Sequence, residues 1–369
     1  MRNRLHSLCP YFAMFPESFV RTEVARFTEP GEVVFDPFSG RGTTLLESLL
    51  MNRKALATDV NPVAFCISGA KADIPTLEQV LNRINQLEVR CRVLGEKHHE
   101  LERGALPQFF HRAFFHTTLG ELLFLRRQLN WKDNHLDRFI AALALGCLHG
   151  DLDSSGSYFS NQMPRTISTK PRYSLNFWKE KRLWPRKRDV FEILRKRARF
   201  RLESERPSLE GVVAMVDARK AGDTFRQFQG RVKAVVTSPP YLNVTNYEED
   251  QWLRLWFLGF PPYPTYTAIS RDDRYTSKAA YWAFLREVWE GIGALLTRDA
   301  VLVCRIGAKG IDREELTGKL RASLKSVFPK NRFLRRPVVS RIRNRQTDAF
   351  RPGAIGCLYE VDYTFSLFG

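Results

Sequence analysis

The sequence predicts an α/β protein built on a parallel sheet, and three observations carry that prediction. An apolar strand, a glycine turn and a helix with leucines at helical spacing follow one another over residues 32–50. A second apolar strand at 54–58 ends at Asp59, and a third begins at Val232 and is stopped by two consecutive prolines. Because open α/β sheets bind ligands at the carboxyl ends of their strands, the polar residues that follow these strands are the first candidates for a site.

Composition narrows the class of protein. With 369 residues, 44% of them hydrophobic, the chain can bury a substantial core. Its formal net charge of +18 and pI near 9.9 favour a polyanionic partner. The six cysteines include no Cys-x-x-Cys, so we expect reduced thiols and neither a disulfide framework nor a zinc cluster. No signal core and no apolar run of about 18 residues occurs, so we expect a cytoplasmic, nucleoid-associated prokaryotic protein with no membrane contact.

The glycine turn at 36–44 suits a nucleoside ligand with amino-acid character. Gly40 and Gly42 let the backbone approach a ligand closely, and the helix that follows offers free N–H groups to a carboxylate. Asp36 is expected to face an ammonium group instead. Asp59 stands about 20 residues further on, where an acidic residue grips a ribose diol in nucleoside-binding folds. An ordinary tight turn and a helix cap at Asp59 are the alternatives.

The third strand leads into Ser238-Pro-Pro-Tyr241, a rigid corner that suits chemistry on an exocyclic amine. Such an amine is a poor nucleophile because its lone pair is delocalised into the base ring. The Ser238 hydroxyl and the Pro239 carbonyl can accept hydrogen bonds from its two N–H groups, and Tyr241 offers a face for an extruded base. Taken alone, the same four residues also fit a proline turn that ends a strand.

With both motifs in this order, the chain resembles the S-adenosylmethionine-dependent DNA amino-methyltransferases. Asp36-Pro-Phe-Ser-Gly-Arg-Gly-Thr-Thr44 looks like their cofactor motif. Thr237-Ser-Pro-Pro-Tyr241 looks like their catalytic motif, in the form typical of the N4-cytosine branch. The resemblance covers roughly residues 6–72 and 211–306 and implies a Rossmann-like methyltransferase fold.

The resemblance also implies the role of each residue. The implied catalytic residues are Ser238, Pro239, Pro240 and Tyr241. The implied cofactor-binding residues are Tyr11, Phe15, Asp36, Pro37, Phe38, Gly40, Gly42, Thr43, Asp59 and Asp217. Of these, Asp217 would receive the adenine amino group, while Tyr11 and Phe15 would close over the methionine end. Arg41 departs from the small residue usual between the glycines, and we predict that it meets DNA at the mouth of the turn.

Between the motifs, residues 75–205 carry helical patterns, and we expect a mainly helical, basic inserted region. From 179 to 201, eleven Lys and Arg residues stand against three acidic ones, with Trp184 among them. Together with the net charge, this run favours a DNA surface over a solvated helix face. The predicted DNA contacts are Arg41, Lys179, Arg182, Arg186, Lys187 and Arg188, with Arg341 and Arg343 from a second basic block. The predicted domains are 1–74 with 206–369, catalytic and cofactor-binding, and 75–205, for target recognition.

The sequence lacks the motifs of several other enzyme classes. There is no Pro-Cys to supply the thiolate that attacks cytosine C5, and no Gly-x4-Gly-Lys-Ser/Thr phosphate loop. The histidines show no metal-like spacing with a carboxylate, so we expect no metal.

The sequence therefore predicts a site-specific methyltransferase that moves a methyl group from S-adenosylmethionine to cytosine N4 of a flipped-out base. Its expected partner is double-stranded DNA, and a cognate restriction endonuclease outside this chain is left open. Adenine-N6 methylation, RNA methylation and an inactive nucleic-acid-binding module are the alternatives.

Overall fold

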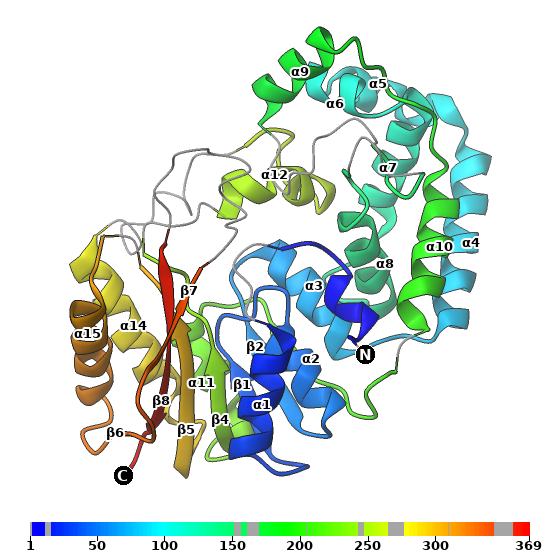
Figure 1. Ribbon diagram of the computed structural model, residues 1–369. Helices are drawn as coiled ribbons and strands as arrows, with labels where there is room; N and C mark the ends of the chain where they lie inside the picture. Colours follow the sequence, from blue (N-terminus) through cyan, green and yellow to red (C-terminus); the bar gives the residue numbers. More distant parts are fainter. Residues whose placement is uncertain are drawn as a thin grey trace. The chain divides into compact units, whose positions relative to one another are not determined.

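The computed structural model describes residues 2–11, 16–150, 156–160, 170–203, 205–242, 247–264, 277–308, 310–342 and 357–369. Of residues 96, 97 and 247–250 it describes the backbone alone. The chain divides into two compact units (Figure 1). The first unit comprises Met1–Phe12, Gly69–Arg206 and Tyr247–Tyr266, and the second comprises Ala13–Ser68, Pro207–Asn246 and Thr267–Gly369.

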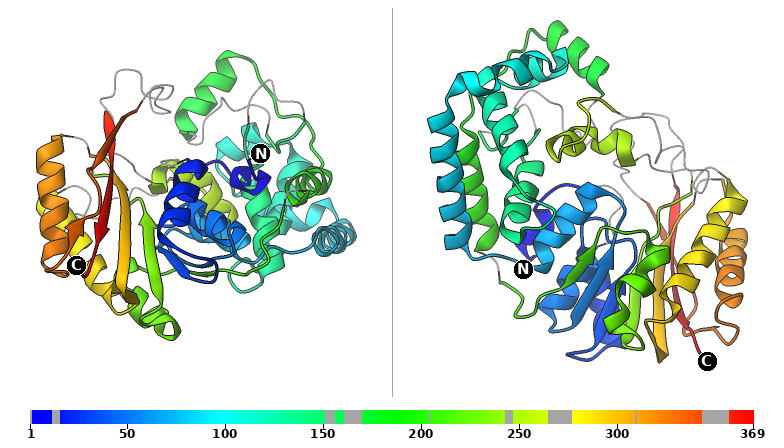
Figure 2. Two further views of the ribbon diagram at one scale, coloured as in Figure 1. Left: turned by 60° about the horizontal axis from the view of Figure 1, so that its bottom comes forward. Right: turned by 180° about the vertical axis from the view of Figure 1, so that it is seen from behind.

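The first unit is helical in its described parts. Its elements are η1 (Arg4–Ser7), α4 (Leu77–Leu94), η2 (Glu96–His99), α5 (Glu100–Gly104), α6 (Gln108–Ala113), α7 (His116–Gln128), α8 (His135–Leu145), α9 (Pro171–Glu180), α10 (Val190–Leu202) and α12 (Tyr247–Phe257). Helix α4 begins with a capping box between Thr76 and Gln79 and buries Val80, Ile84 and Leu87. Helices α4 and α10 run side by side, as the views of Figure 2 also show.

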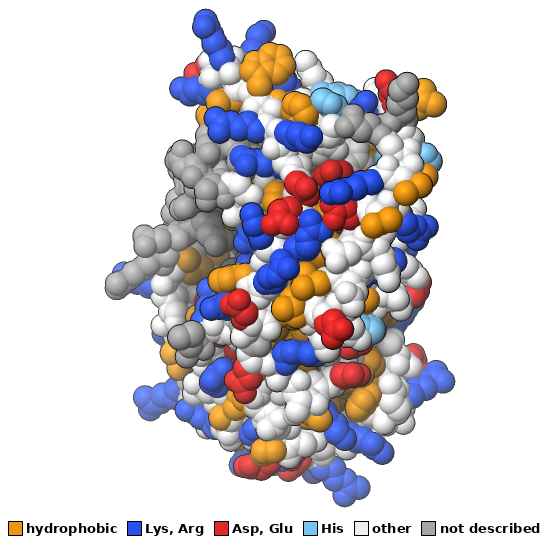
Figure 3. Space-filling view, turned by 90° about the vertical axis from the view of Figure 1, so that its right-hand side faces the viewer, with side chains coloured by type: hydrophobic (Ala, Val, Ile, Leu, Met, Phe, Trp, Pro, Cys, Tyr) orange, Lys and Arg blue, Asp and Glu red, His pale blue; other side chains and the backbone are white. Residues whose placement is uncertain are grey.

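Aromatic side chains form much of the interior of the first unit. The Phe109 ring of α6 lies 5.4 Å from Trp178 of α9 and 4.9 Å from Trp252 of α12, measured between ring centroids. Phe110 lies 4.5 Å from Trp256 in the same way. These contacts tie α6, α9 and α12 together. Outside, Lys and Arg side chains are interspersed with acidic ones on the face that Figure 3 shows.

The second unit is an eight-stranded mixed sheet with the strand order β3-β2-β1-β4-β5-β8-β6 and with β7 paired to β8. The strands are β1 (Val33–Asp36), β2 (Lys54–Thr58), β3 (Val212–Ala214), β4 (Val232–Thr237), β5 (Leu296–Ile306), β6 (Arg332–Phe333), β7 (Val338–Arg341) and β8 (Tyr359–Ser366). Strands β1 to β5 pair in parallel, while β8 is antiparallel to β5, β6 and β7. This topology confirms the predicted Rossmann-like α/β class, and its order reverses between β1 and β4.

Helices cover both faces of the sheet, as Figures 1 and 2 show. They are α1 (Glu17–Phe27), α2 (Thr43–Leu50), α3 (Pro62–Ala72), α11 (Ala221–Thr224), α14 (Lys278–Gly293) and α15 (Arg313–Lys325), with the short turns η3 (Ala218–Lys220) and η4 (Arg226–Phe228). The division between the units falls within α3.

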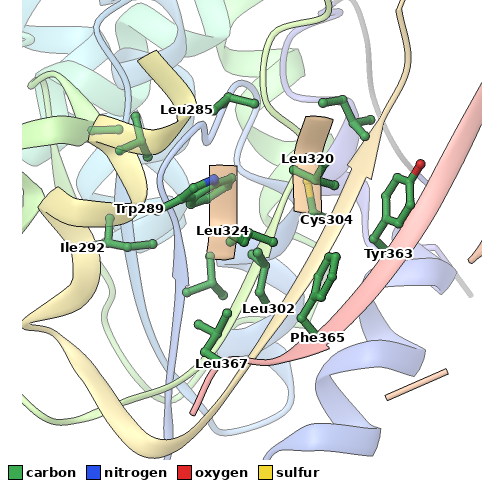
Figure 4. Packing of buried hydrophobic residues seen from close by; sticks show 14 of the residues in the cluster. Leu285, Trp289, Ile292, Leu302, Cys304, Leu320, Leu324, Tyr363, Phe365 and Leu367 are labelled. Atoms are coloured by element: carbon green, nitrogen blue, oxygen red, sulfur yellow. The ribbon is translucent and has the colours of Figure 1, made fainter. Parts of the chain in front are cut away.

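Alternation along the strands divides the core between the two faces. Phe35 and Val235 belong to a large cluster that contains Trp289 and Leu324 from α14 and α15. Figure 4 shows Leu302, Cys304, Tyr363 and Phe365 of β5 and β8 beside those helices. On the opposite face, residues of α1 pack against alternate strand residues, and the cluster consists of Val20, Val24, Val34, Ala234, Val236, Val301 and Val303. Burial of both faces explains why the strands are almost continuously apolar.

Candidate active site

A hydrogen bond joins the ends of β1 and β4, where the strand order reverses. The Thr237 hydroxyl donates to Asp36 Oδ1 over 2.6 Å, and the Phe38 N–H donates to the same oxygen over 3.0 Å. Asp36 is 1% exposed, and burial raises the pKa of its carboxyl to about 6 despite these donors. The glycine turn after β1 and the Ser-Pro-Pro-Tyr corner after β4 therefore start from adjacent points on one sheet edge.

The glycine turn places the start of α2 at that edge. Gly42 has φ of 72° and caps α2, and its N–H donates to the Ser39 carbonyl over 2.7 Å. A β-carbon at Gly42 would lie 3.0 Å from Ser68 Cβ, so the turn needs glycine for both its backbone angle and its space. Thr43 is the first residue of α2 and is buried. The buried Ser39 hydroxyl has no hydrogen-bond partner among the described residues, which leaves it for a ligand.

Asp59 follows β2 and is hydrogen-bonded to the same glycine turn. The Gly40 N–H donates to Asp59 Oδ2 over 2.9 Å, and the Asn61 N–H donates to Oδ1 over 2.9 Å. Burial raises the pKa of this carboxyl, too, to about 6. Pro37 contributes its carbonyl, which accepts from the Thr58 hydroxyl over 2.9 Å. The polar ends of β1 and β2 are thus held together mainly by backbone groups.

Asp217 lies beyond β3 and already has a charged partner. Its carboxylate accepts from the Arg219 backbone N–H and, over 3.0 and 2.8 Å, from the Arg219 guanidinium. Arg219 in turn pairs with Glu287 at 2.8 Å and lies over the Phe284 ring, which contacts Phe38 edge to face. An adenine amino group at Asp217 would therefore share the carboxylate with a guanidinium. The sequence pattern did not indicate Arg219.

The Ser-Pro-Pro-Tyr corner is more enclosed than a free stacking platform. Ser238 and Pro240 are half-buried, Pro239 is buried, and Tyr241 is only 8% exposed. The Ser238 hydroxyl donates to the Tyr241 hydroxyl oxygen over 3.4 Å, and the Tyr241 hydroxyl donates to Glu360 Oε1 over 2.8 Å. Burial, and then the charge of Glu360, raise the pKa of Tyr241 well above its ordinary value. Tyr241 is therefore a neutral, anchored side chain.

Arg41 has a structural role in the second unit. It is 6% exposed, its guanidinium pairs with Glu17 of α1 at 2.7 Å, and its Nε donates to the Thr43 hydroxyl over 3.1 Å. A guanidinium buried in this way holds α1 to the glycine turn and is not on a surface that DNA could reach. The sequence prediction missed Glu17 as its partner.

The remaining predicted residues belong to other elements or fall outside the described ranges. Tyr11 is buried in the first unit. Phe15 and Arg343 lie outside the described residues. Arg341 is exposed at the end of β7.

The basic run of the first unit separates into two parts. Lys179, Arg182, Arg186 and Lys187 are exposed, and Arg188 is half-buried, with its pKa lowered by burial. Beside them the Trp184 ring is 67% exposed, and the Arg112 guanidinium lies 3.8 Å from its centroid. We call residues 179–188 the basic segment.

Three arginines of α10 have partners inside the first unit, whereas Arg199 of the same helix is exposed. Arg195 pairs with Glu88 and, at 3.2 Å, with Glu192. Arg197 donates to the Ser157 carbonyl over 3.0 Å and lies over the Tyr158 ring. Arg201 is 7% exposed and donates to the Arg4 carbonyl over 3.0 Å. Much of the positive charge that the sequence shows in this run is therefore used in packing.

Metal clusters and membrane-spanning helices are absent from the part of the chain that the structure describes. Within it, no group of three or more His, Cys, Asp and Glu could hold a metal ion. No described helix combines the length and the apolar character needed to cross a bilayer.

Comparison with protein families finds a match for the N-terminal part of the chain. Residues 2–68 match the DNA methylase family. The chain is 26% identical over 115 residues to the type II methyltransferase M.MjaII of Methanocaldococcus jannaschii, a match that covers 30% of this chain and 22% of that protein. It is 39% identical over 49 residues to the orphan methyltransferase M.BamHII of Bacillus amyloliquefaciens, with 13% and 18% covered. The chain thus spans about a fifth of the length of these curated relatives.

Solved structures resemble the whole chain only loosely. TrmN from Thermus thermophilus aligns with a TM-score of 0.36 and 9% identity, over 99% of this chain and 52% of that one. The rRNA methyltransferase AviRa from Streptomyces viridochromogenes aligns with a TM-score of 0.36 and 12% identity, over 99% and 92%.

Proposed function

We propose that the chain methylates the exocyclic N4 amine of cytosine in DNA, and the match of residues 2–68 to the DNA methylase family supports this proposal. Its cofactor is S-adenosylmethionine, as the sequence predicted. The choice of cytosine N4 rests on Ser238, the residue that the N4-cytosine form of the catalytic motif carries. The observation that carries the proposal is the hydrogen bond between Thr237 and Asp36, because it brings the two motifs, 201 residues apart, to one sheet edge.

The residues at this edge suit the predicted cofactor. Asp36 and Asp59 are carboxyls whose pKa is raised to about 6 by burial, so a cationic or hydroxyl-bearing ligand would gain from pairing with them. The Ser39 hydroxyl is buried without a partner among the described residues, and the N-terminus of α2 adds free N–H groups. S-adenosylmethionine, when bound, supplies a methyl group on a sulfonium that carries its own leaving group.

The protein's own part in the reaction is placement and hydrogen bonding. The Ser238 hydroxyl oxygen and the Pro239 carbonyl accept from the target amine and draw its nitrogen lone pair out of the base ring. A base reaches this corner only after it leaves the duplex. Tyr241 borders the corner, and its buried ring limits how far the base can shift. The released proton passes to water.

We propose that the basic segment of the first unit contacts the phosphates of double-stranded DNA. Lys179, Arg182, Arg186 and Lys187 are exposed, which a phosphate contact requires, whereas Arg195 and Arg201 are committed to internal partners. The exposed Trp184 ring, backed by Arg112, adds a flat surface of the kind that stacks on bases. Arg341 on β7 is a further exposed candidate.

Product analysis tests the proposal directly. The purified protein is incubated with mixed-sequence duplex DNA and labelled S-adenosylmethionine, and the digested nucleosides are identified by mass spectrometry. We expect label in N4-methylcytosine. Label in N6-methyladenine would keep the enzyme class and overturn the assignment of the amine. Label in RNA alone would overturn the DNA substrate, and cofactor binding without transfer to any nucleic acid would favour a binding module.

A further inference from the structure

The Tyr241 hydroxyl is hydrogen-bonded to the first of a chain of charged side chains that lie outside the two sequence motifs. Glu360 of β8 accepts the hydroxyl proton through Oε1 at 2.8 Å. Its other oxygen, Oε2, lies 3.9 Å from Arg305 Nη1 of β5. Arg305 in turn makes a bidentate pair with Asp362, in which both side chains are less than a tenth exposed.

An ionised carboxylate can only accept hydrogen bonds, and this fixes the direction of every bond in the chain. The single proton of the Tyr241 hydroxyl is donated to Glu360, so toward Ser238 the same oxygen can only accept. The Ser238 hydroxyl therefore donates its proton to Tyr241, at 3.4 Å, and turns its lone pairs away from that bond.

We propose that Glu360 is a positioning residue that sets the direction of the hydrogen bonds at the catalytic corner, so that Ser238 faces the target amine as an acceptor. The inference rests on the proposed methylation of an amine. That chemistry needs acceptors, because a hydroxyl proton pointing at the amine would compete for the lone pair that must attack the methyl group. Glu360 acts through Tyr241 and does not itself reach the reacting atoms.

The packing around Tyr241 supports a fixed geometry. Gly307 follows β5, and a β-carbon there would lie 3.1 Å from Tyr241 Cε2 and 2.5 Å from Cys357 Sγ. Leu242 makes a parallel bridge with Ala308, which holds the chain just beyond the corner. Burial keeps Tyr241 neutral, with its pKa well above the ordinary value, so the hydroxyl proton stays available for donation. The Tyr241 ring thus has little freedom to turn its hydroxyl toward another partner.

A double-mutant cycle tests the proposal, with Glu360→Gln, Tyr241→Phe and the combined variant. Glutamine keeps the shape of Glu360 but can donate as well as accept, so it no longer fixes the direction of the chain. Phenylalanine removes the hydroxyl and leaves the ring. We expect each single change to lower kcat about tenfold, with the cofactor Kd within about twofold of wild type. The combined variant should be no slower than the slower single variant, because both changes break one chain.

The control is Tyr363→Phe, which removes a tyrosine hydroxyl of β8 that is bonded to Thr317 at 2.8 Å. We expect it to leave kcat unchanged. Thermal melts identify any variant that fails to fold, and Tyr241→Phe, the mildest change, then carries the test.

Two results overturn the inference while the proposed function stands: wild-type kcat in Glu360→Gln or in Tyr241→Phe, or reductions that multiply to about 100-fold in the combined variant. A wild-type protein that methylates no nucleic-acid amine would instead overturn the proposed function, and the inference with it.

Discussion

The sheet edge of the second unit and the basic segment of the first unit hold their polar groups in opposite ways. At the edge, Asp36, Thr237 and Tyr241 are buried, and each has a partner at 2.6 to 2.8 Å. In the basic segment, Arg182, Arg186 and Lys187 are exposed. The function of the first region therefore depends on single atoms in fixed places, whereas that of the second depends on the number of charges.

The largest effect is expected from a single atom at the edge. Ser238→Ala removes the acceptor oxygen, and we expect kcat to fall by roughly 100-fold or more while the cofactor Kd changes less than about threefold. Tyr241→Ala should behave in the same way. Single-turnover methylation and equilibrium binding separate the two quantities. Retained turnover in both variants would remove the assignment of the corner as catalytic.

We expect DNA affinity to fall strongly only when several residues of the basic segment are replaced together. Replacing Lys179, Arg182, Arg186 and Lys187 together by alanine is expected to weaken DNA binding roughly 10- to 100-fold. The salt slope of binding should become shallower by about 0.9 for each phosphate that is no longer neutralised. Arg186→Ala alone should change affinity only about twofold to fourfold.

The matched variant for that experiment is Arg195→Ala on α10. It breaks the pair with Glu88, whose side chain is 11% exposed, and should lower the free energy of unfolding by about 1 to 3 kcal/mol with the salt slope unchanged. Titrations at several salt concentrations, together with urea unfolding, distinguish the two behaviours. A shallower salt slope of DNA binding in Arg195→Ala would contradict the distinction between the DNA-binding basic segment and the internally paired arginines of α10.

We expect the Asp36 carboxylate to strengthen cofactor binding but to lower the free energy of unfolding at neutral pH. Its folded pKa of about 6 lies above the ordinary 3.8, so the folded state holds the extra proton between these values. The free energy of unfolding of the cofactor-free protein should therefore fall as pH rises from about 4 to 6, by roughly 3 kcal/mol at most. Asp36→Asn should remove this contribution and leave the similar one of Asp59, whose pKa is also raised to about 6. It should stabilise the protein at neutral pH, yet weaken cofactor binding about tenfold.

Urea unfolding and cofactor titration, at a mildly acidic and at a neutral pH, test the Asp36 prediction. Asp299→Asn is the control, because that carboxylate is exposed and paired with Lys233 away from the sheet edge. A destabilised Asp36→Asn variant at neutral pH would show that the carboxylate is a net stabilising group.

The smallest effect concerns Arg41. Arg41→Ala removes the pair with Glu17 and should lower the free energy of unfolding by about 2 kcal/mol. The salt slope of DNA binding should stay as in wild type, because the guanidinium is buried. A reduced slope would restore the DNA contact that the sequence suggested for this residue.

Local patterns predicted the sheet edge well. Strand β2 begins and ends where its apolar run indicated, β4 begins where its apolar run begins, and glycine at position 42 has the positive φ that its turn needs. The α/β class followed from these elements, and the Rossmann-like methyltransferase fold followed from the resemblance of the two motifs to a known family.

Partners that are distant in sequence gave no local signal. Glu360 lies 119 residues from Tyr241, and Glu17 lies 24 residues from Arg41, so neither pairing appears as a spacing. The basic run looked uniform in sequence because charge alone does not tell Arg186 from Arg195. Arg195 differs from Arg186 because it pairs with Glu88 of α4, which is distant in the sequence, and with Glu192 of its own helix.

Strand β8 has a consequence for how the protein is made. It lies between β5 and β6 in the sheet but is synthesised after both. Until residues 359–366 have left the ribosome, the edge of β5 has no partner on that side, and Tyr241 has no Glu360. A nascent chain that pauses before this point exposes an apolar strand edge, the kind of surface that chaperones cover and that otherwise aggregates.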